Sequence, residues 1–244
     1  MSSTQYTDAY RAHTARLLAT LERDEALKTA IGGEFIAVGQ LQFHLLRHYG
    51  LHDTHHVIDV GCGSGRLAAQ LAPLAGLHYL GLDVVPDLLE LARRLSSRDD
   101  WSFVCSPGTG IDAPDASADF VCFFSVFTHL LHEDSYRYLA EALRVLKPGG
   151  HVIFSFLEFC VPCHWFVFAD TVRQTASGQH LNQFMDRDAI RAWADHLGFE
   201  IVAIHPGDHG HIPIPERIIW ENGTVMEKLG NMGQSVAVLR KPRS

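Results

Sequence analysis

The chain of 244 residues carries 20 lysines and arginines against 28 aspartates and glutamates, which gives a formal net charge of −8 at pH 7. Contacts to the phosphates of DNA or RNA need a basic face, so this balance argues against a nucleic-acid partner. A hydrophobic content of 47% and a charged content of 20% are ordinary for a globular protein, and the length allows one large α/β domain.

The sequence shows neither an apolar run long enough to cross a bilayer nor a secretory leader pattern. The five cysteines are odd in number and are expected to be free thiols. Cys160 and Cys163 have the spacing of a redox or zinc pair, but no second pair accompanies them, and we assign them no role. We therefore expect a cytoplasmic monomer or homodimer with no membrane partner.

Apolar residues at helical spacing occupy positions 6–30 and resume from Val38 to Gly50, with a Gly32-Gly33 turn between them. This pattern predicts helices ahead of the first strand. We therefore divide the chain into a helical cap segment at 1–50 and a core domain at 51–244.

From position 56 onward, strand and helix patterns alternate, which is typical of right-handed crossovers in a parallel sheet. The predicted strands cover 56–60, 78–82, 101–105, 119–125 and 150–157, and the predicted helices cover 65–73, 86–97 and 133–146. Beyond 157 we expect a helix that begins at Asp186 or Asp188 and ends at Leu197, then strands at 198–204 and 234–239.

The first strand leads into a glycine turn, Gly61-x-Gly63-x-Gly65, where missing side chains allow a ligand to approach the backbone. A dinucleotide fingerprint would place its third glycine at the position that Arg66 occupies here. The next strand ends at Asp83, where a carboxylate can accept both hydroxyl protons of a ribose. The spacing therefore favours a nucleoside cofactor without a pyrophosphate.

Four landmarks in this order resemble the class I S-adenosylmethionine-dependent methyltransferases. They are the motif at 57–65, the acid Asp83, the strand at 118–125 and the segment at 142–154, which contains Lys147-Pro148-Gly149-Gly150. The resemblance implies a doubly wound, Rossmann-like α/β fold. Its mostly parallel sheet would have seven strands, helices on both faces and an antiparallel last strand.

The resemblance also implies a site for S-adenosylmethionine, with S-adenosylhomocysteine (SAH) as its product. Asp59 would lie near the amino group of the cofactor, Asp83 would bind the ribose, and Val84 would lie against adenine. The family often has an acid near position 107 that contacts the adenine amine, and here that residue is Pro107. The other expected contacts are Gly61, Cys62, Gly63 and Gly65 in the turn, Gly108 or Thr109 in place of the missing acid, and Phe124 and Ser125 at the methionine end.

Two residues are candidate catalytic groups for the acceptor. His129 follows the fourth strand and titrates near neutral pH, as a general base must, although it also fits a packing role. Glu158 follows the fifth strand and would face the crevice of a doubly wound sheet, but surface exposure explains it as well. Aromatic residues within 158–185 fit either an acceptor lid or a core, and Tyr6, Tyr10, Phe35 and Gln40 fit either the site or helix packing.

Two histidine clusters, at 52–56 and 205–211, have donor spacing that suits zinc, but polar turns explain their composition and we assign no metal site. The sequence thus predicts a cytoplasmic enzyme that methylates a small-molecule acceptor at O, N, S or carboxylate. The alternatives are a different reaction of the same cofactor and a non-catalytic cofactor-binding partner subunit.

Overall fold

A computed structural model of the protein describes residues 3–106, 108–174 and 182–243. A seven-stranded sheet forms its centre, with the order β3-β2-β1-β4-β5-β9-β6. Its strands are β1 (His56–Val60), β2 (His78–Asp83), β3 (Ser102–Cys105), β4 (Ala118–Phe123), β5 (Leu146–Phe156), β6 (Glu200–His205) and β9 (Ser235–Arg240). The helices are α1 (Ser3–Leu18), α2 (Arg23–Ala30), α3 (Phe35–His48), α4 (Arg66–Leu71), α5 (Pro86–Ser96), α6 (His132–Val145), α7 (Pro162–Gln174) and α8 (Arg187–Leu197).

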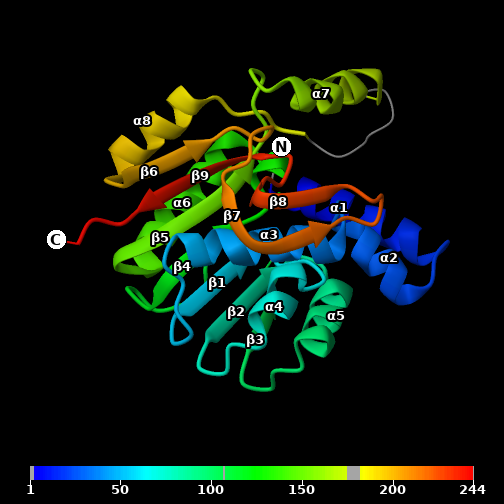
Figure 1. Ribbon diagram of the computed structural model, residues 1–244, viewed down its shortest axis with the longest axis horizontal. Helices are drawn as coiled ribbons and strands as arrows, with labels where there is room; N and C mark the ends of the chain where they lie inside the picture. Colours follow the sequence, from blue (N-terminus) through cyan, green and yellow to red (C-terminus); the bar gives the residue numbers. More distant parts are fainter. Residues whose placement is uncertain (1–2, 107, 175–181, 244) are drawn as a thin grey trace.

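The sheet has the predicted doubly wound topology (Figure 1). Strands β1 to β5 pair in parallel, and the strand order reverses between β1 and β4. Strand β9 inserts between β5 and β6 and runs antiparallel to both. The prediction of a Rossmann-like sheet with an antiparallel last strand is confirmed. A topological switch point of this kind is where ligands bind in open α/β sheets.

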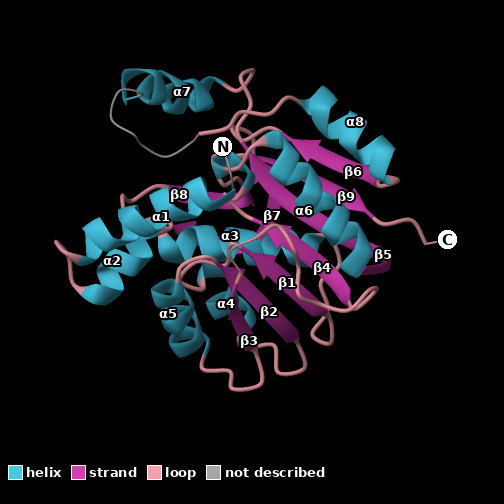
Figure 2. Cartoon of the chain, turned by 180° about the vertical axis from the view of Figure 1, so that it is seen from behind, coloured by secondary structure: helices cyan, strands magenta, loops and turns pink. Residues whose placement is uncertain are grey.

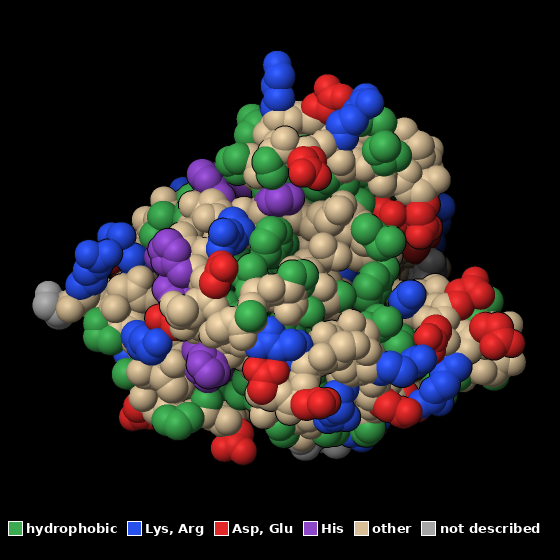
Figure 3. Space-filling model, turned by 60° about the horizontal axis from the view of Figure 1, so that its bottom comes forward, with side chains coloured by type: hydrophobic (Ala, Val, Ile, Leu, Met, Phe, Trp, Pro, Cys, Tyr) green, Lys and Arg blue, Asp and Glu red, His purple; other side chains and the backbone are tan. Residues whose placement is uncertain are grey.

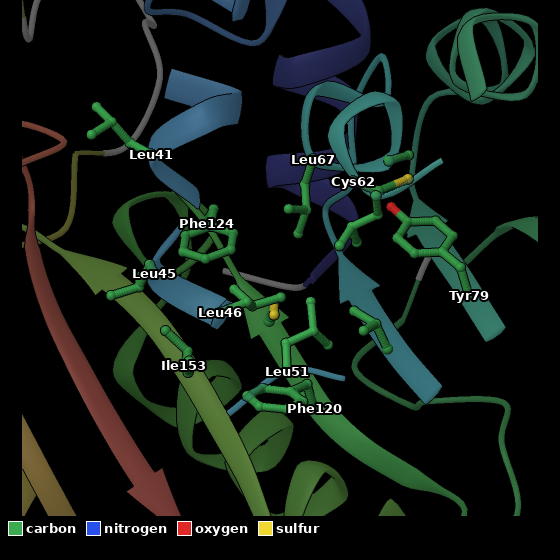
Figure 4. Packing of buried hydrophobic residues seen from close by; sticks show 14 of the residues in the cluster. Leu41, Leu45, Leu46, Leu51, Cys62, Leu67, Tyr79, Phe120, Phe124 and Ile153 are labelled. Carbon is green, nitrogen blue, oxygen red and sulfur yellow. The ribbon is translucent and has the colours of Figure 1, made fainter. Parts of the chain in front are cut away.

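Helices cover both faces of the sheet because neighbouring residues of a buried strand point to opposite faces (Figure 2). On β1, Val57 packs with the cluster beneath α3, α4 and α5, whereas Ile58 packs with the cluster beneath α6 and α8. Figure 4 shows the first cluster, in which leucines of α3 meet Phe120 and Ile153 of the sheet. The α3 helix is thereby fixed against the strands that form the site.

The segment before the first strand contains three helices, α1, α2 and α3, where the sequence indicated a pair. The chain leaves the α-helical path after Leu18, and the hydroxyl of Thr20 donates to the carbonyls of Arg16 and Leu17. These side-chain bonds satisfy carbonyl groups that the helix end would otherwise leave open. The cap segment at 1–50 remains our interpretation of this part of the chain.

A two-stranded hairpin, β7 (Ile212–Ile219) and β8 (Val225–Gly230), was not predicted from the sequence. The prolines at 213 and 215 weaken a strand pattern because proline cannot donate to a ladder. The pair Asn222-Gly223, a common hairpin turn, was the signal that could have revealed it. The hairpin packs on α3, and a Cβ at Gly230 would lie only 2.3 Å from Leu41.

For the strands and helices predicted from position 56 onward, the boundaries differ from the structure by at most two residues, except at the start of β5. The β5 strand begins at Leu146, before the Pro148-Gly149-Gly150 turn and not after it. The reason is that Leu146 pairs with Ala118 and the register then shifts to Phe120 and His151. At α8, Asp186 is the cap: its Oδ1 accepts from the N–H of Ala189 at 2.8 Å. Among the described helices, none has both the length and the apolar character of a bilayer span.

Candidate active site

A cavity of about 330 Å³ lies at the carboxyl ends of β1, β2 and β4. Its wall combines the glycine turn after β1, the ends of the neighbouring strands, and residues of α1 and α3. Among the predicted site residues, those that line it are Asp59, Gly61, Cys62, Gly63, Asp83, Val84, Phe124, Ser125 and His129. The topology therefore brings together most of the residues that the sequence indicated.

The glycine turn is tightly enclosed. Gly61 and Gly63 have φ angles of 72° and 55°, in the left-handed region that favours glycine. A Cβ on Gly61 would lie 2.4 Å from Cγ2 of Val126, and a Cβ on Gly63 would lie 2.5 Å from Cγ2 of Ile31. Gly65 caps α4 at φ 84° and packs on Ala92, outside the cavity lining. Any larger residue at these positions would displace the wall of the cavity.

The N–H groups of the turn are almost all used within the protein. Those of Gly61 and Cys62 donate to the carbonyl of Leu82, and that of Gly65 donates to the carbonyl of Cys62. The N–H of Gly63 donates to Asp83. A pyrophosphate at a helix N-terminus needs free N–H donors, so this turn is a poor anion site. The geometry thus supports the prediction of a cofactor without a pyrophosphate.

Asp83 at the end of β2 is buried, and both of its carboxylate oxygens accept backbone N–H groups. Oδ2 accepts from Gly63 and Oδ1 from Val85, each at 2.9 Å. Burial raises the pKa of Asp83 to about 6, although the backbone donors oppose the shift. Each oxygen keeps a second lone pair, so the carboxylate remains able to accept hydroxyl protons from a ligand in the cavity.

Asp59 is the second buried carboxyl group in the cavity. Its Oδ2 accepts the hydroxyl of Tyr79 at 2.8 Å, and burial raises its pKa to about 7. Figure 4 shows the Tyr79 ring reaching from β2 toward the glycine turn, where the Cys62 side chain packs in the apolar cluster. Two buried carboxyl groups in one cavity suit a ligand with an ammonium group and hydroxyls.

Arg66 links the glycine turn to the N-terminal helices. Its side chain is buried, and Nη2 donates to the carbonyls of Ile31 and Gly32 at 3.0 and 2.7 Å. In the sequence analysis, Arg66 served only to exclude a dinucleotide-binding motif, and nothing in the pattern predicted this contact. The turn between α2 and α3 is thereby held over the cavity, where Ile31 and Gly32 form part of the lining.

Ser125 follows β4 in a left-handed conformation with φ 59°. Its N–H donates to Oγ of Ser155 at 2.7 Å, and Ser155 in turn donates to Oε1 of Gln234 at 2.6 Å. Oγ of Ser125 donates to the same Gln234 oxygen at 3.3 Å. A non-glycine residue with positive φ persists where its surroundings hold it, and such residues gather at functional sites. Gln234, distant in sequence, was not predicted.

The two candidate catalytic groups lie in different surroundings. His129 ends a short 3-10 helix, η1 (Phe127–His129), and lines the cavity. Glu158 lies outside the lining, where its two oxygens accept from Arg187 at 2.7 and 2.8 Å and from Ser235. The pKa of Glu158 is lowered by these hydrogen bonds, against its burial. The arrangement makes Glu158 a structural ion pair at the end of β5.

The residues that we expected to contact adenine in place of the missing acid do not line the cavity. Gly108 and Thr109 are absent from the lining, and the carbonyl of Gly108 accepts the hydroxyl of Tyr138 at 2.7 Å. Pro107 lies outside the described residues. Ser106 and Tyr138 line this end of the cavity instead. Tyr138 was missed because it comes from α6 and reaches the site only through packing.

The N-terminal residues that line the cavity differ in part from those that the sequence suggested. Tyr10 lines the cavity, whereas Phe35 and Gln40 do not; the side chain of Tyr6 lies outside the described part of the chain. Gln42, buried on α3, takes part in the lining. Burial raises the pKa of Tyr10 well above its usual range, so its phenol stays protonated.

The two histidine clusters whose spacing suits zinc, at 52–56 and 205–211, both lie within the described residues. In the described part of the chain, no group of three or more His, Cys, Asp and Glu side chains is placed to hold a metal ion. Of the second cluster, His205 stacks on His211 with ring centroids 4.4 Å apart and shares a 2.6 Å hydrogen bond with Tyr49. On the face drawn in Figure 3, histidines gather toward one side, and acidic and basic side chains are interspersed.

A doubly wound sheet with a glycine turn, a buried acid at the next strand end and no anion cradle defines a nucleoside-binding α/β protein. Comparison with known proteins narrows this class. Residues 58–154 match the family model of a methyltransferase domain. Residues 58–154 of the chain therefore contain a methyltransferase domain, and the chain has the fold of S-adenosylmethionine-dependent methyltransferases.

Individual relatives agree with this assignment. A demethylmenaquinone methyltransferase of Deinococcus radiodurans is 33% identical over 46% of each chain. A malonyl-[acyl-carrier protein] O-methyltransferase of Serratia marcescens is 25% identical over 72% of this chain and 62% of its own. The chain thus spans less than half the length of the Deinococcus relative.

A solved structure shares the fold over nearly the whole chain. The magnesium protoporphyrin IX methyltransferase of Synechocystis, with bound SAH, superposes with a TM-score of 0.62. The superposition covers 97% of this chain and 99% of the other, at 15% identity.

Proposed function

We propose that this protein transfers a methyl group from S-adenosylmethionine to a small-molecule acceptor. The observation that carries the proposal is the placement of Asp59 and Asp83 in one cavity, at neighbouring strand ends under a glycine turn with almost no unused N–H groups. Asp59 would hold the ammonium group of the cofactor and Asp83 the ribose hydroxyls. Gly61 and Gly63 would allow the methionine part to lie against the backbone.

The cofactor, when bound, supplies a methyl group on a sulfonium that is already a good leaving group. The protein therefore contributes mainly by orienting the acceptor and excluding water. The enclosure is built from Phe124 and Val126 on one side and from the α2–α3 turn, held by Arg66, on the other. His129 lines the same cavity and would receive a proton from a hydroxyl or amine acceptor.

Ser125 and Gln234 would position the methionine end. The hydrogen bonds from Ser125 and Ser155 to Gln234 fix the backbone after β4 in its left-handed conformation. This leaves the start of η1, and with it His129, in a defined place beside the cavity. Glu158 has no part in this proposal because its carboxylate is bound to Arg187.

Incubation of the protein with S-adenosylmethionine and a panel of hydroxyl, carboxyl, amine and thiol acceptors tests the proposal. Mass spectrometry should detect SAH and a product heavier by one methyl group. Release of another product of the cofactor would indicate a different reaction of the same site. Tight SAH binding without any turnover across the panel would indicate a non-catalytic subunit. The cytoplasmic location and the monomeric or homodimeric state remain predictions.

A further inference from the structure

The α7 helix exposes large aromatic side chains. Trp165 to Ala169 are five consecutive apolar residues, and a helix cannot turn five consecutive side chains toward one face. Phe166 is 77% exposed and Trp165 is 53% exposed, and Phe159 just before the helix is 52% exposed. A contiguous exposed apolar surface of this kind is typical of an interaction site.

Four aromatic rings of this region are in mutual contact; we call them the aromatic shelf and define it as Phe159, Trp165, Phe168 and Phe184. Phe166 points to another side of the helix and is not part of the shelf. Phe159 stacks on Phe184 with ring centroids 4.6 Å apart, and Phe168 packs against both. The ring of Trp165 lies 5.0 Å from that of Phe168. The shelf is therefore a fixed arrangement of rings and presents an apolar surface that needs no rearrangement before it binds.

The shelf lies next to the wall of the cavity. Next to Phe184, the N–H of Gln183 donates to the carbonyl of Thr128 at 2.7 Å, and a ring nitrogen of His132 lies 3.0 Å from the carbonyl of Phe184. Thr128 immediately precedes His129, which lines the cavity. Figures 1 and 2 agree that α7 lies at the same end of the sheet as α1, beyond the carboxyl ends of the strands.

We propose that the methyl acceptor carries a long apolar tail, and that this tail lies on the aromatic shelf while the polar head enters the cavity beside His129. The inference rests on the proposed function and specifies its substrate class. The shelf favours a tail because it lies next to the cavity: Gln183, which precedes the shelf residue Phe184, is hydrogen-bonded to Thr128, which precedes His129 of the cavity wall. Binding of the tail would then orient the head, although the tail itself lies away from the reacting atom.

Binding of two phenols to the SAH-loaded protein tests the inference, with 4-dodecylphenol and 4-ethylphenol as probes. A tail on the shelf should shift the tryptophan fluorescence to shorter wavelength. Because the chain has three other tryptophans, Trp165→Phe serves to assign the shift, which should be absent in that variant. The long-tailed probe should bind on the order of tenfold more tightly or better, since each buried methylene adds affinity. The variant Phe159→Ser, which removes a half-exposed ring of the shelf, should lose most of this gain and keep its SAH affinity.

The matched control is Ile219→Ser, which removes a 60% exposed side chain from the end of β7. It should retain the full tail-dependent gain. An equal gain in wild type and Phe159→Ser, or an equal loss in both variants, would overturn the inference. Self-association that Phe159→Ser abolishes would assign the shelf to a second copy. Binding to phosphatidylcholine vesicles without discrimination between the phenols would assign it to a bilayer, and either result overturns the inference.

Different results would overturn the proposed function and the inference about the acceptor tail. Absence of SAH binding by wild-type protein would remove the proposed function and this inference with it. Normal SAH binding without discrimination between the two phenols would remove the inference alone.

Discussion

The N–H of Gly63 donates to Oδ2 of Asp83 at 2.9 Å, so a single hydrogen bond joins the turn after β1 to the end of β2. The bond has two consequences. It consumes the donor that an anionic ligand would need, and it fixes the carboxylate beside the glycine turn at a strand end that faces the cavity. The preference for a ribose over a pyrophosphate thus follows from the same contact.

The variant Asp83→Ala is expected to weaken SAH binding by about tenfold or more, because a hydrogen bond to a charged group is worth about 1.5–3 kcal/mol. Differential scanning fluorimetry measures this as a smaller rise in Tm at a fixed SAH concentration. Asp87→Ala, which changes an exposed carboxylate of α5, is the control and should show the wild-type rise. An undiminished rise in Asp83→Ala would remove this residue from the site.

Asp59 makes the stability of the unbound protein depend on pH. Its pKa is raised to about 7 in the folded state, from about 3.9 in an unfolded chain. The folded state therefore holds a proton that the unfolded state has lost, so the stabilisation is complete below about pH 4 and is lost as the pH rises to about 7. From pH 5 to pH 8, urea denaturation should show a larger loss of stability for wild type than for Asp59→Asn. Equal losses would contradict the prediction.

The same group should couple SAH binding to proton release. An ammonium group beside Asp59 favours the ionised carboxylate, so binding near pH 6 should expel a proton and affinity should rise toward pH 7. Calorimetry in buffers with different ionisation enthalpies measures the number of protons released. Asp59→Asn should release fewer protons than wild type, and an unchanged number would place the titration at another group.

The variant Arg66→Met is expected to loosen the N-terminal helices over the cavity. It leaves the partly exposed carbonyls of Ile31 and Gly32 without their protein donor, at a cost of about 1 kcal/mol for each lost hydrogen bond. Hydrogen exchange should become faster in α1 and α2 while the strands keep their protection. Arg23→Met, which removes an exposed ion-pairing side chain, should leave α1 unaffected. Unchanged exchange in Arg66→Met would mean that other contacts hold the cap.

For His129→Ala, we expect turnover to fall by about 10²–10⁴-fold with SAH affinity unchanged, as for the loss of a general base. The measurements are kcat from SAH release and Kd from calorimetry. His196→Ala, an exposed histidine in the last turn of α8, is the control. If kcat is retained in His129→Ala, this histidine serves only to pack the turn after β4.

The sequence was sufficient to predict the positions of site residues that lie close together along the chain. Strand, glycine turn and terminal acid follow one another within short intervals, so the positions of Asp59, Gly63 and Asp83 at one sheet edge could be deduced from the parallel topology alone. The same deduction placed His129 beside them. These predictions required no knowledge of how distant segments pack.

The residues that sequence reasoning missed reach the site through tertiary packing. Gln234 contacts Ser125 only because β9 inserts between β5 and β6. Arg66 and Gln42 belong to helices whose pattern indicates burial but not the direction of a polar group. Glu158 shows the opposite case: its strand-end position predicted a catalytic role, but its buried carboxylate forms an ion pair with the partly exposed Arg187 of α8.

Calorimetric titration of the purified protein with SAH, and in parallel with NAD, tests the central claim most directly. The account predicts that one SAH molecule binds per chain and that NAD gives no saturable heat. Saturable binding of NAD with none of SAH would show that the turn at Gly63 accepts a pyrophosphate, and would contradict the account.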